Sequence, residues 1–143
     1  MNDLMSAMEQ QLGFKAVDIK SYSPLALAYI GDGVFDLIIR SYVLNKGNMQ
    51  VNKLHRHTSS IVKAQTQAKM AVFLEPSLSE EEDAVYKRGR NAKSHTTAKN
   101  ASVGDYRKAT GFEALLGYLY LTGQNDRLME LVKMALTEIG EIK

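Results

Sequence analysis

Residues 26–38 read ALAYIGDGVFDLI, an apolar stretch with Asp32 near its centre, between Gly31 and Gly33. Glycine is a poor helix former, and an unpaired carboxylate in apolar surroundings costs free energy. Places where a sequence breaks two local rules at once tend to be functional or strained. The stretch therefore predicts an apolar helix that carries a candidate site residue, Asp32.

A second stretch, ATGFEALLGYLYL at residues 109–121, repeats this pattern around Glu113, with Gly111 and Gly117 beside it. Glycines allow another backbone or a ligand to come close. Two carboxylates brought together in a dry setting repel each other unless a cation lies between them. Magnesium binds oxygen ligands and needs only one or two protein carboxylates. The two stretches are thus compatible with one magnesium site.

Ion pairs are the alternative explanation for both acids. Asp32 and Glu113 would then each be neutralised by a basic residue of the chain. The nearby candidates are Arg40, Arg107 and Lys108. Chemistry alone leaves the metal site and the ion pairs open. Asp36 has a simpler explanation. It precedes Arg40 by four residues, and this spacing favours an ion pair on one helix face over a metal-ligating role.

The composition is that of one globular domain, which we expect to span residues 1–143. The chain has no cysteine, which excludes disulfides, thiolate zinc sites and a cysteine nucleophile. No apolar run is long enough for a transmembrane helix, and the N-terminus lacks the pattern of a secretory signal. We expect a cytoplasmic protein that does not bind a membrane.

The apolar periodicity is helical throughout, and no segment alternates like a strand. The sequence predicts an all-α bundle of about five to seven helices. Residues 1–20 are expected to form a weakly helical, mobile N-terminal extension, and residues 91–104 a surface loop. The other predicted helices begin at Ser23-Pro24 and then span about 52–74, 80–89, 105–122 and 125–139.

The middle of the chain is basic. Residues 46–108 contain 12 of the 18 lysines and arginines but six of the 16 acids. Basic side chains beside neutral donors suit phosphates and sugar hydroxyls, which is how duplex RNA is largely recognised. A solvated charged loop is the alternative. The candidate RNA-binding residues are Lys87, Arg88, Arg90, Lys93, Lys99, Arg107 and Lys108.

These motifs resemble a known family. LALAYIGDGVFDLIIR, residues 25–40, resembles the signature helix of ribonuclease III nuclease domains, and GFEALLGYLYL, residues 111–121, resembles their second metal-binding helix. KRGRNAK at 87–93 and YRKAT at 106–110 resemble Mini-ribonuclease 3, the branch that has only the nuclease domain. The resemblance covers residues 22–136 and implies the ribonuclease III-like endonuclease helical bundle.

The resemblance also implies an activity. Asp32 and Glu113 would be the catalytic residues and the ligands of Mg²⁺ in an endoribonuclease that cuts double-stranded RNA and leaves 5′-phosphate ends. The family works as a homodimer with two sites. The Mini branch matures the ends of the 23S ribosomal RNA precursor, aided by a large-subunit ribosomal protein.

The sequence departs from the larger ribonuclease III pattern at two positions. Ala28 and Thr110 stand where that pattern has a glutamate and an aspartate, so four carboxylates become two. The Mini branch is similar in lacking them. The alternative function is a catalytically dead module of the same fold that only binds double-stranded RNA.

Overall fold

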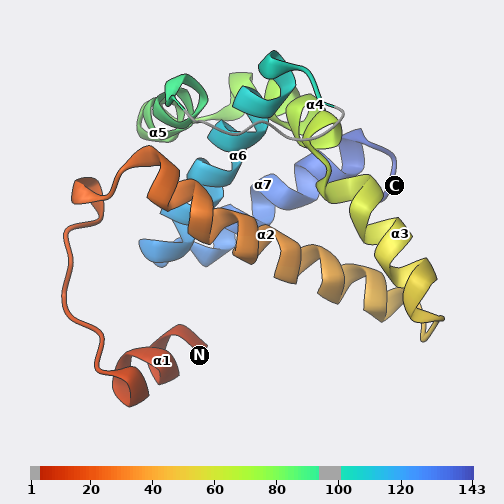
Figure 1. Ribbon diagram of the computed structural model, residues 1–143, viewed down its shortest axis with the longest axis horizontal. Coiled ribbons are helices and arrows are strands. Elements are labelled where there is room, and N and C mark those ends of the chain that lie inside the picture. The colour runs from red at the N-terminus through yellow and green to blue at the C-terminus, as the bar shows by residue number, and fades with distance from the viewer. Residues whose placement is uncertain (1–3, 94–100) are drawn as a thin grey trace.

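A computed structural model describes residues 4–93 and 101–143. Within these residues the chain is all-α, as predicted, with no strand (Figure 1). None of the helices described is long and apolar enough to cross a membrane. The helices are α1 (Leu4–Leu12), α2 (Pro24–Lys46), α3 (Val51–Val62), α4 (Ala64–Leu74), α5 (Glu80–Asn91), α6 (Val103–Leu121) and α7 (Asn125–Glu138), with 3-10 turns η1 (Ile19–Ser21) and η2 (Glu75–Ser77).

Helix α6 is the centre of the bundle. It contacts α2, α4, α5 and α7, and its residues from Ala109 to Leu119, except Glu113, are buried. A helix that is buried on nearly all sides needs apolar residues all round, which explains the continuous apolar run. The Phe112 ring meets Phe35 of α2 edge-on, with 5.2 Å between the ring centroids. Glu113 is therefore a carboxylate at the edge of the main core.

Local side-chain chemistry explains most helix ends. Ser23 caps α2, accepting from the Ala26 amide at 3.1 Å, with Pro24 at the first helical position. Ser79 and Glu82 form a capping box at the start of α5, and Gly123 takes a left-handed backbone conformation (φ +72°) after α6. These features confirm the predicted starts of α2 and α5 and the end of α6.

The predicted loop at residues 91–104 is too long. Helix α5 continues to Asn91, and α6 begins at Val103 because the Ser102 hydroxyl accepts a hydrogen bond from the Asp105 amide at 3.0 Å. Residues 94–100 lie outside the described part of the chain.

The predicted single helix over residues 52–74 is wrong, because α3 and α4 are separate helices. Lys63 between them has an extended backbone (φ −66°, ψ 154°). The Thr66 hydroxyl donates to the Ser60 carbonyl at 2.7 Å, and the Gln67 amide nitrogen donates to the Val62 carbonyl at 2.7 Å. Side-chain hydrogen bonds of this kind compete with a continuous helix, although neither glycine nor proline is present.

Helices α2 and α6 touch backbone to backbone at two glycines. A Cβ atom on Gly31 would lie 1.8 Å from the Glu113 carbonyl oxygen, and one on Gly117 would lie 2.0 Å from the Leu27 carbonyl oxygen. No side chain fits in either place. The absent Cβ atoms therefore set how closely the two helices cross.

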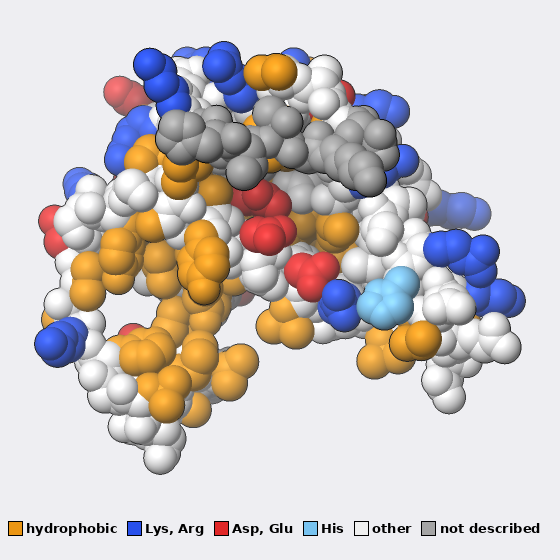
Figure 2. Space-filling model, in the orientation of Figure 1, with side chains coloured by type: hydrophobic (Ala, Val, Ile, Leu, Met, Phe, Trp, Pro, Cys, Tyr) orange, Lys and Arg blue, Asp and Glu red, His pale blue; other side chains and the backbone are white. Residues whose placement is uncertain are grey.

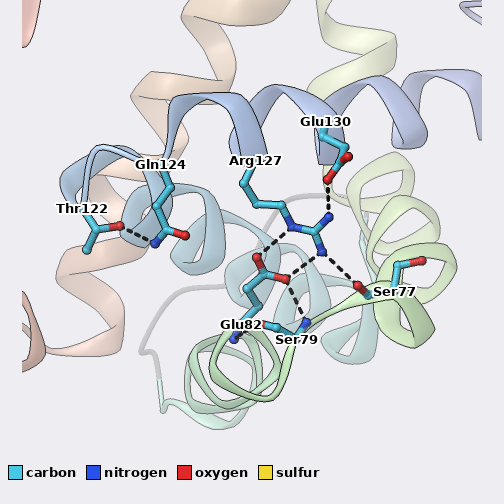
Figure 3. Close-up of polar contacts among 7 residues, drawn as sticks. All are labelled: Ser77, Ser79, Glu82, Thr122, Gln124, Arg127 and Glu130. Atoms are coloured by element: carbon cyan, nitrogen blue, oxygen red, sulfur yellow. Dashed lines mark hydrogen bonds and ion pairs between the residues drawn. The ribbon is translucent and has the colours of Figure 1, made fainter.

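An ion pair that the sequence did not reveal joins α5 to α7 (Figure 3). Arg127 donates to both oxygens of Glu82, at 2.8 and 2.9 Å, and to the Ser77 carbonyl at 2.9 Å. The hydrogen bond from Arg127 lowers the pKa of Glu82, whose side chain is only 7% exposed. Glu82 also completes the capping box of α5. Glu82 and Arg127 together therefore fasten α5, α7 and η2, with Arg127 making the contact to η2.

Helix α1 lies at the lower left of Figure 1 and has no buried residue. It contacts the bundle where the Tyr120 hydroxyl of α6 lies 4.0 Å from the Met5 sulfur. The expected helicity of the N-terminal extension is thus present in residues 4–12. Its mobility, and the treatment of residues 1–143 as one domain, stay predictions.

The crossing of α2 and α6 predicts opposite effects on stability for alanine substitutions at two glycines of α2. Gly31→Ala should lower the free energy of unfolding by about 1–3 kcal/mol or more, because two backbones must separate. Gly33→Ala is the matched control: nothing lies within 4 Å of its added Cβ, so it should raise stability by about 1 kcal/mol through helix propensity. Urea unfolding of both variants measures this. Equal effects at the two positions would contradict the crossing.

Candidate active site

The crossing of α2 and α6 brings Asp32 and Glu113 together. Gly31, the neighbour of Asp32, is packed on the backbone carbonyl of Glu113 itself. Asp32 is exposed and Glu113 is half-buried, so the pair lies at the edge of the core and is open to solvent on one side. Acidic side chains gather near the middle of the face shown in Figure 2. The structure thus pairs the two acids that the sequence singled out.

The surroundings of Glu113 favour its neutral form when no cation is present. Burial, and then the charge of Asp32 and the hydrogen bond to it, raise the pKa of Glu113 to about 8. The ordinary value is 4.5. A carboxyl group with a pKa this far above its usual range, next to a second carboxyl group, is typical of functional sites.

The ion-pair alternative is not supported within residues 4–93 and 101–143. Arg40 binds Asp36 at 2.7 Å, as the spacing on the helix predicted. Neither Asp32 nor Glu113 forms an ion pair with a described lysine or arginine. The two carboxyl groups therefore have each other as neighbours instead of a basic residue.

Gln67 of α4 is a member of this site that sequence reasoning missed. Its amide nitrogen donates to Oε2 of Glu113 at 3.2 Å and to the Val62 carbonyl at 2.7 Å. The side chain is almost fully buried, with 2% of the residue exposed. One signal was present: a glutamine lies between Ala64 and Ala71 on the apolar side of the predicted helix.

The donors at this site fit a hard divalent cation. Asp32 and Glu113 offer carboxylate oxygens, and the buried Oε1 atom of Gln67 has no hydrogen-bond partner among the described residues. Carboxylate and amide oxygens suit Mg²⁺, Mn²⁺ and Ca²⁺. The part of the chain that is described has no group of three or more His, Cys, Asp or Glu residues that could hold a metal ion, so the only acidic ligands offered here are the two carboxylates.

The two positions at which the larger family has acids supply no carboxylate. Ala28 is a core residue, 7% exposed. Thr110 is 8% exposed, and its hydroxyl donates to the Tyr106 carbonyl at 2.9 Å. The carboxylates at the α2–α6 crossing are therefore those of Asp32 and Glu113.

The basic candidates fall into two groups, those that contact another side chain of the protein and those described by their exposure alone. Lys and Arg side chains gather over α5 at the upper left of Figure 2. Lys87 is paired with Asp83 at 2.8 Å, and the Arg90 guanidinium lies over the Tyr86 ring, 5.7 Å from its centroid. The other described candidates are Arg88, Lys93 and Arg107, which are exposed, and Lys108, which is half-buried. Lys99 lies outside the described residues. Contact with RNA stays a prediction for all seven.

Comparison with known families agrees with this fold. A model of the Ribonuclease III domain matches residues 25–124, which include both acids and the whole α2–α6 crossing. A crystal structure of a Fusobacterium nucleatum protein superposes with a TM-score of 0.78 at 29% identity, over 86% of this chain and 98% of that one. The fold is that of a ribonuclease III domain.

Relatives with known names show to which branch of the family the chain belongs. The chain is 49% identical to Mini-ribonuclease 3 of Enterococcus faecalis, over 87% of this chain and 96% of that protein. It is 49% identical to Mini-ribonuclease 3 of Clostridium tetani, over 86% of this chain and 82% of that protein. The chain belongs to the Mini-ribonuclease 3 branch of the ribonuclease III family. This confirms the resemblance, the fold class and the enzyme class of endoribonuclease.

The raised pKa of Glu113 predicts a pH dependence of stability in the metal-free protein. Folding favours the protonated carboxyl group, so this stabilisation is complete below about pH 4.5 and is lost as the pH rises to about 8. Glu113→Gln resembles the protonated form at every pH. Its melting temperature should therefore rise relative to the parent protein between pH 5 and 8, measured in a chelator.

Glu138→Gln is the control, because Glu138 is exposed at the end of α7. Its melting temperature should keep a constant offset from the parent protein over the same range. A constant offset for Glu113→Gln as well would contradict the raised pKa.

Proposed function

We propose that the chain is a magnesium-dependent endoribonuclease that cleaves double-stranded RNA, with Asp32 and Glu113 as the metal ligands and catalytic residues. The observation that carries this proposal is the pair of carboxyl groups at the α2–α6 crossing, without a basic neighbour among the described residues. The ribonuclease III family, to which the chain belongs, depends on divalent metals and acts on double-stranded RNA. The chemistry and the family thus support the same function.

Each acid has its own part in the mechanism. A bound divalent cation offsets charge on the scissile phosphate and orients the attacking water. Asp32, which is exposed, and Glu113, which is half-buried, would hold the cation through their carboxylate oxygens. Glu113 must lose its proton to act as a ligand. Metal binding therefore releases a proton from this site and becomes stronger as the pH rises.

The basic residues of α5 and the start of α6 would hold the duplex. Arg88, Lys93 and Arg107 have exposed side chains for phosphates. Contacts of this kind position a duplex without reading its sequence. Two copies of the chain, each with one carboxylate pair, would cut the two strands and leave 5′-phosphate and 3′-hydroxyl ends.

The natural substrate we propose is the 23S ribosomal RNA precursor, processed in the cytoplasm with the help of a large-subunit ribosomal protein. Support for this comes from the Mini-ribonuclease 3 relatives and from the resemblance of the motifs. A catalytically dead RNA-binding module is the second candidate, favoured by the replacement of two family acids by Ala28 and Thr110.

Substitution of the acids separates these two functions. Asp32→Asn and Glu113→Gln should each lower the rate of duplex RNA cleavage by at least ~10², because each removes a charged ligand of the cation that would stabilise the reacting phosphate. Asp36→Asn is the matched control: Asp36 lies one turn further along α2, pairs with Arg40, and should keep nearly the full rate. Magnesium-dependent cleavage of a labelled duplex measures all three. A parent protein with no activity at any magnesium concentration would support the dead module.

The RNA-binding surface predicts a change in salt dependence. Replacing Arg88, Arg90 and Lys93 with alanine should weaken duplex binding and flatten the plot of log affinity against log salt, by about 0.7–0.9 per lost phosphate contact. The control replaces the exposed Lys15, Lys133 and Lys143, none of which lies on α5 or α6. Its slope should match the parent. An unchanged slope for the first variant would show that these side chains do not touch phosphate.

A further inference from the structure

The side chain of Gln67 is arranged in an unusual way for a buried residue. Both hydrogens of its amide nitrogen are used, one toward the Val62 carbonyl at 2.7 Å and one toward Glu113 Oε2 at 3.2 Å. Its amide oxygen is buried and has no hydrogen-bond partner among residues 4–93 and 101–143. Leaving a buried acceptor unpaired is unfavourable, and a bound water or ion is one explanation for such a group.

The break between α3 and α4 produces this arrangement. With Lys63 extended, the Val62 carbonyl loses its helical partner and accepts from the Gln67 amide instead. This bond fixes which end of the amide is nitrogen, because a carbonyl needs a donor. The amide oxygen of Gln67 is therefore the end that has no donor. The amide nitrogen of the same side chain is bonded to Glu113, a candidate metal ligand.

We propose that Gln67 completes the metal site: its nitrogen orients the Glu113 carboxylate, and its oxygen is a third oxygen donor to the divalent cation. Amide oxygens are ordinary ligands of hard cations, and the charge of the site stays at two carboxylates. The inference rests on the proposed metal-dependent function. It gives the site a third oxygen donor where Ala28 and Thr110 supply no carboxylate.

Two variants of the helix break test the proposal. Gln67→Met keeps the length of the side chain but removes both amide atoms. Thr66→Val is the matched control, because it removes the Thr66 hydrogen bond to the Ser60 carbonyl at 2.7 Å in the same break and leaves the amide in place. Both should lower the melting temperature of the metal-free protein. Calorimetric titration with Mn²⁺ should show at least about 10-fold weaker binding for Gln67→Met, and unchanged binding for Thr66→Val.

A second measurement uses the unaltered protein, in case Gln67→Met does not fold. The side-chain amide resonances of Gln67 should shift during a Mg²⁺ titration and saturate together with the metal site. The side-chain amide of Gln124, which donates to Thr122 beyond the end of α6, is the control and should not shift.

Two results would overturn the inference, and they differ from failure of the proposed function. Gln67→Met with parental Mn²⁺ affinity would limit Gln67 to a structural role at the helix break. Saturable Mg²⁺ binding without a shift of the Gln67 amide would do the same. If the parent protein and Thr66→Val bind no divalent ion at all, the metal-dependent function itself is wrong, and the inference falls with it.

Discussion

The site depends on one backbone contact, the close crossing of α2 and α6 at Gly31 and Gly117. Because both glycines lack a Cβ atom, Gly31 packs against the carbonyl of Glu113, and the next residue, Asp32, is brought beside the Glu113 side chain. The apolar core around α6 holds this crossing in place, and its burial is what makes the carboxyl pair unfavourable when no cation is present. Stability and function therefore compete at the same residues.

Much of the fold follows from local chemistry that a sequence displays. Ser23-Pro24, the capping box at Ser79 and Gly123 each mark a helix end through their own side chains or backbone freedom. The two candidate acids could be predicted from the sequence for a similar reason. A charged residue among apolar residues and glycines has no local explanation. Features of this kind need no knowledge of what lies across the bundle.

The remaining features depend on contacts between distant segments. The break at Lys63 has no glycine or proline, and it forms because Thr66 and Gln67 supply alternative hydrogen bonds. The capping box of Glu82 is local, but the partner of this carboxylate, Arg127, is 45 residues away. Gln67 belongs to the site only because α4 packs against α6. These features depend on which helices pack against each other. The period of apolar residues along one helix does not show which helix will be its neighbour.

The most direct test of the site is the position of a bound ion. Crystals grown with Mn²⁺ give an anomalous signal that locates the ion without reference to activity. We predict one strong peak per chain between the carboxylates of Asp32 and Glu113, at a distance of about 2.0–2.4 Å from the nearest oxygens, typical of hard cations. A peak found only elsewhere, or no peak at this pair in Mn²⁺-saturated crystals, would contradict the assignment of the α2–α6 crossing as the catalytic metal site.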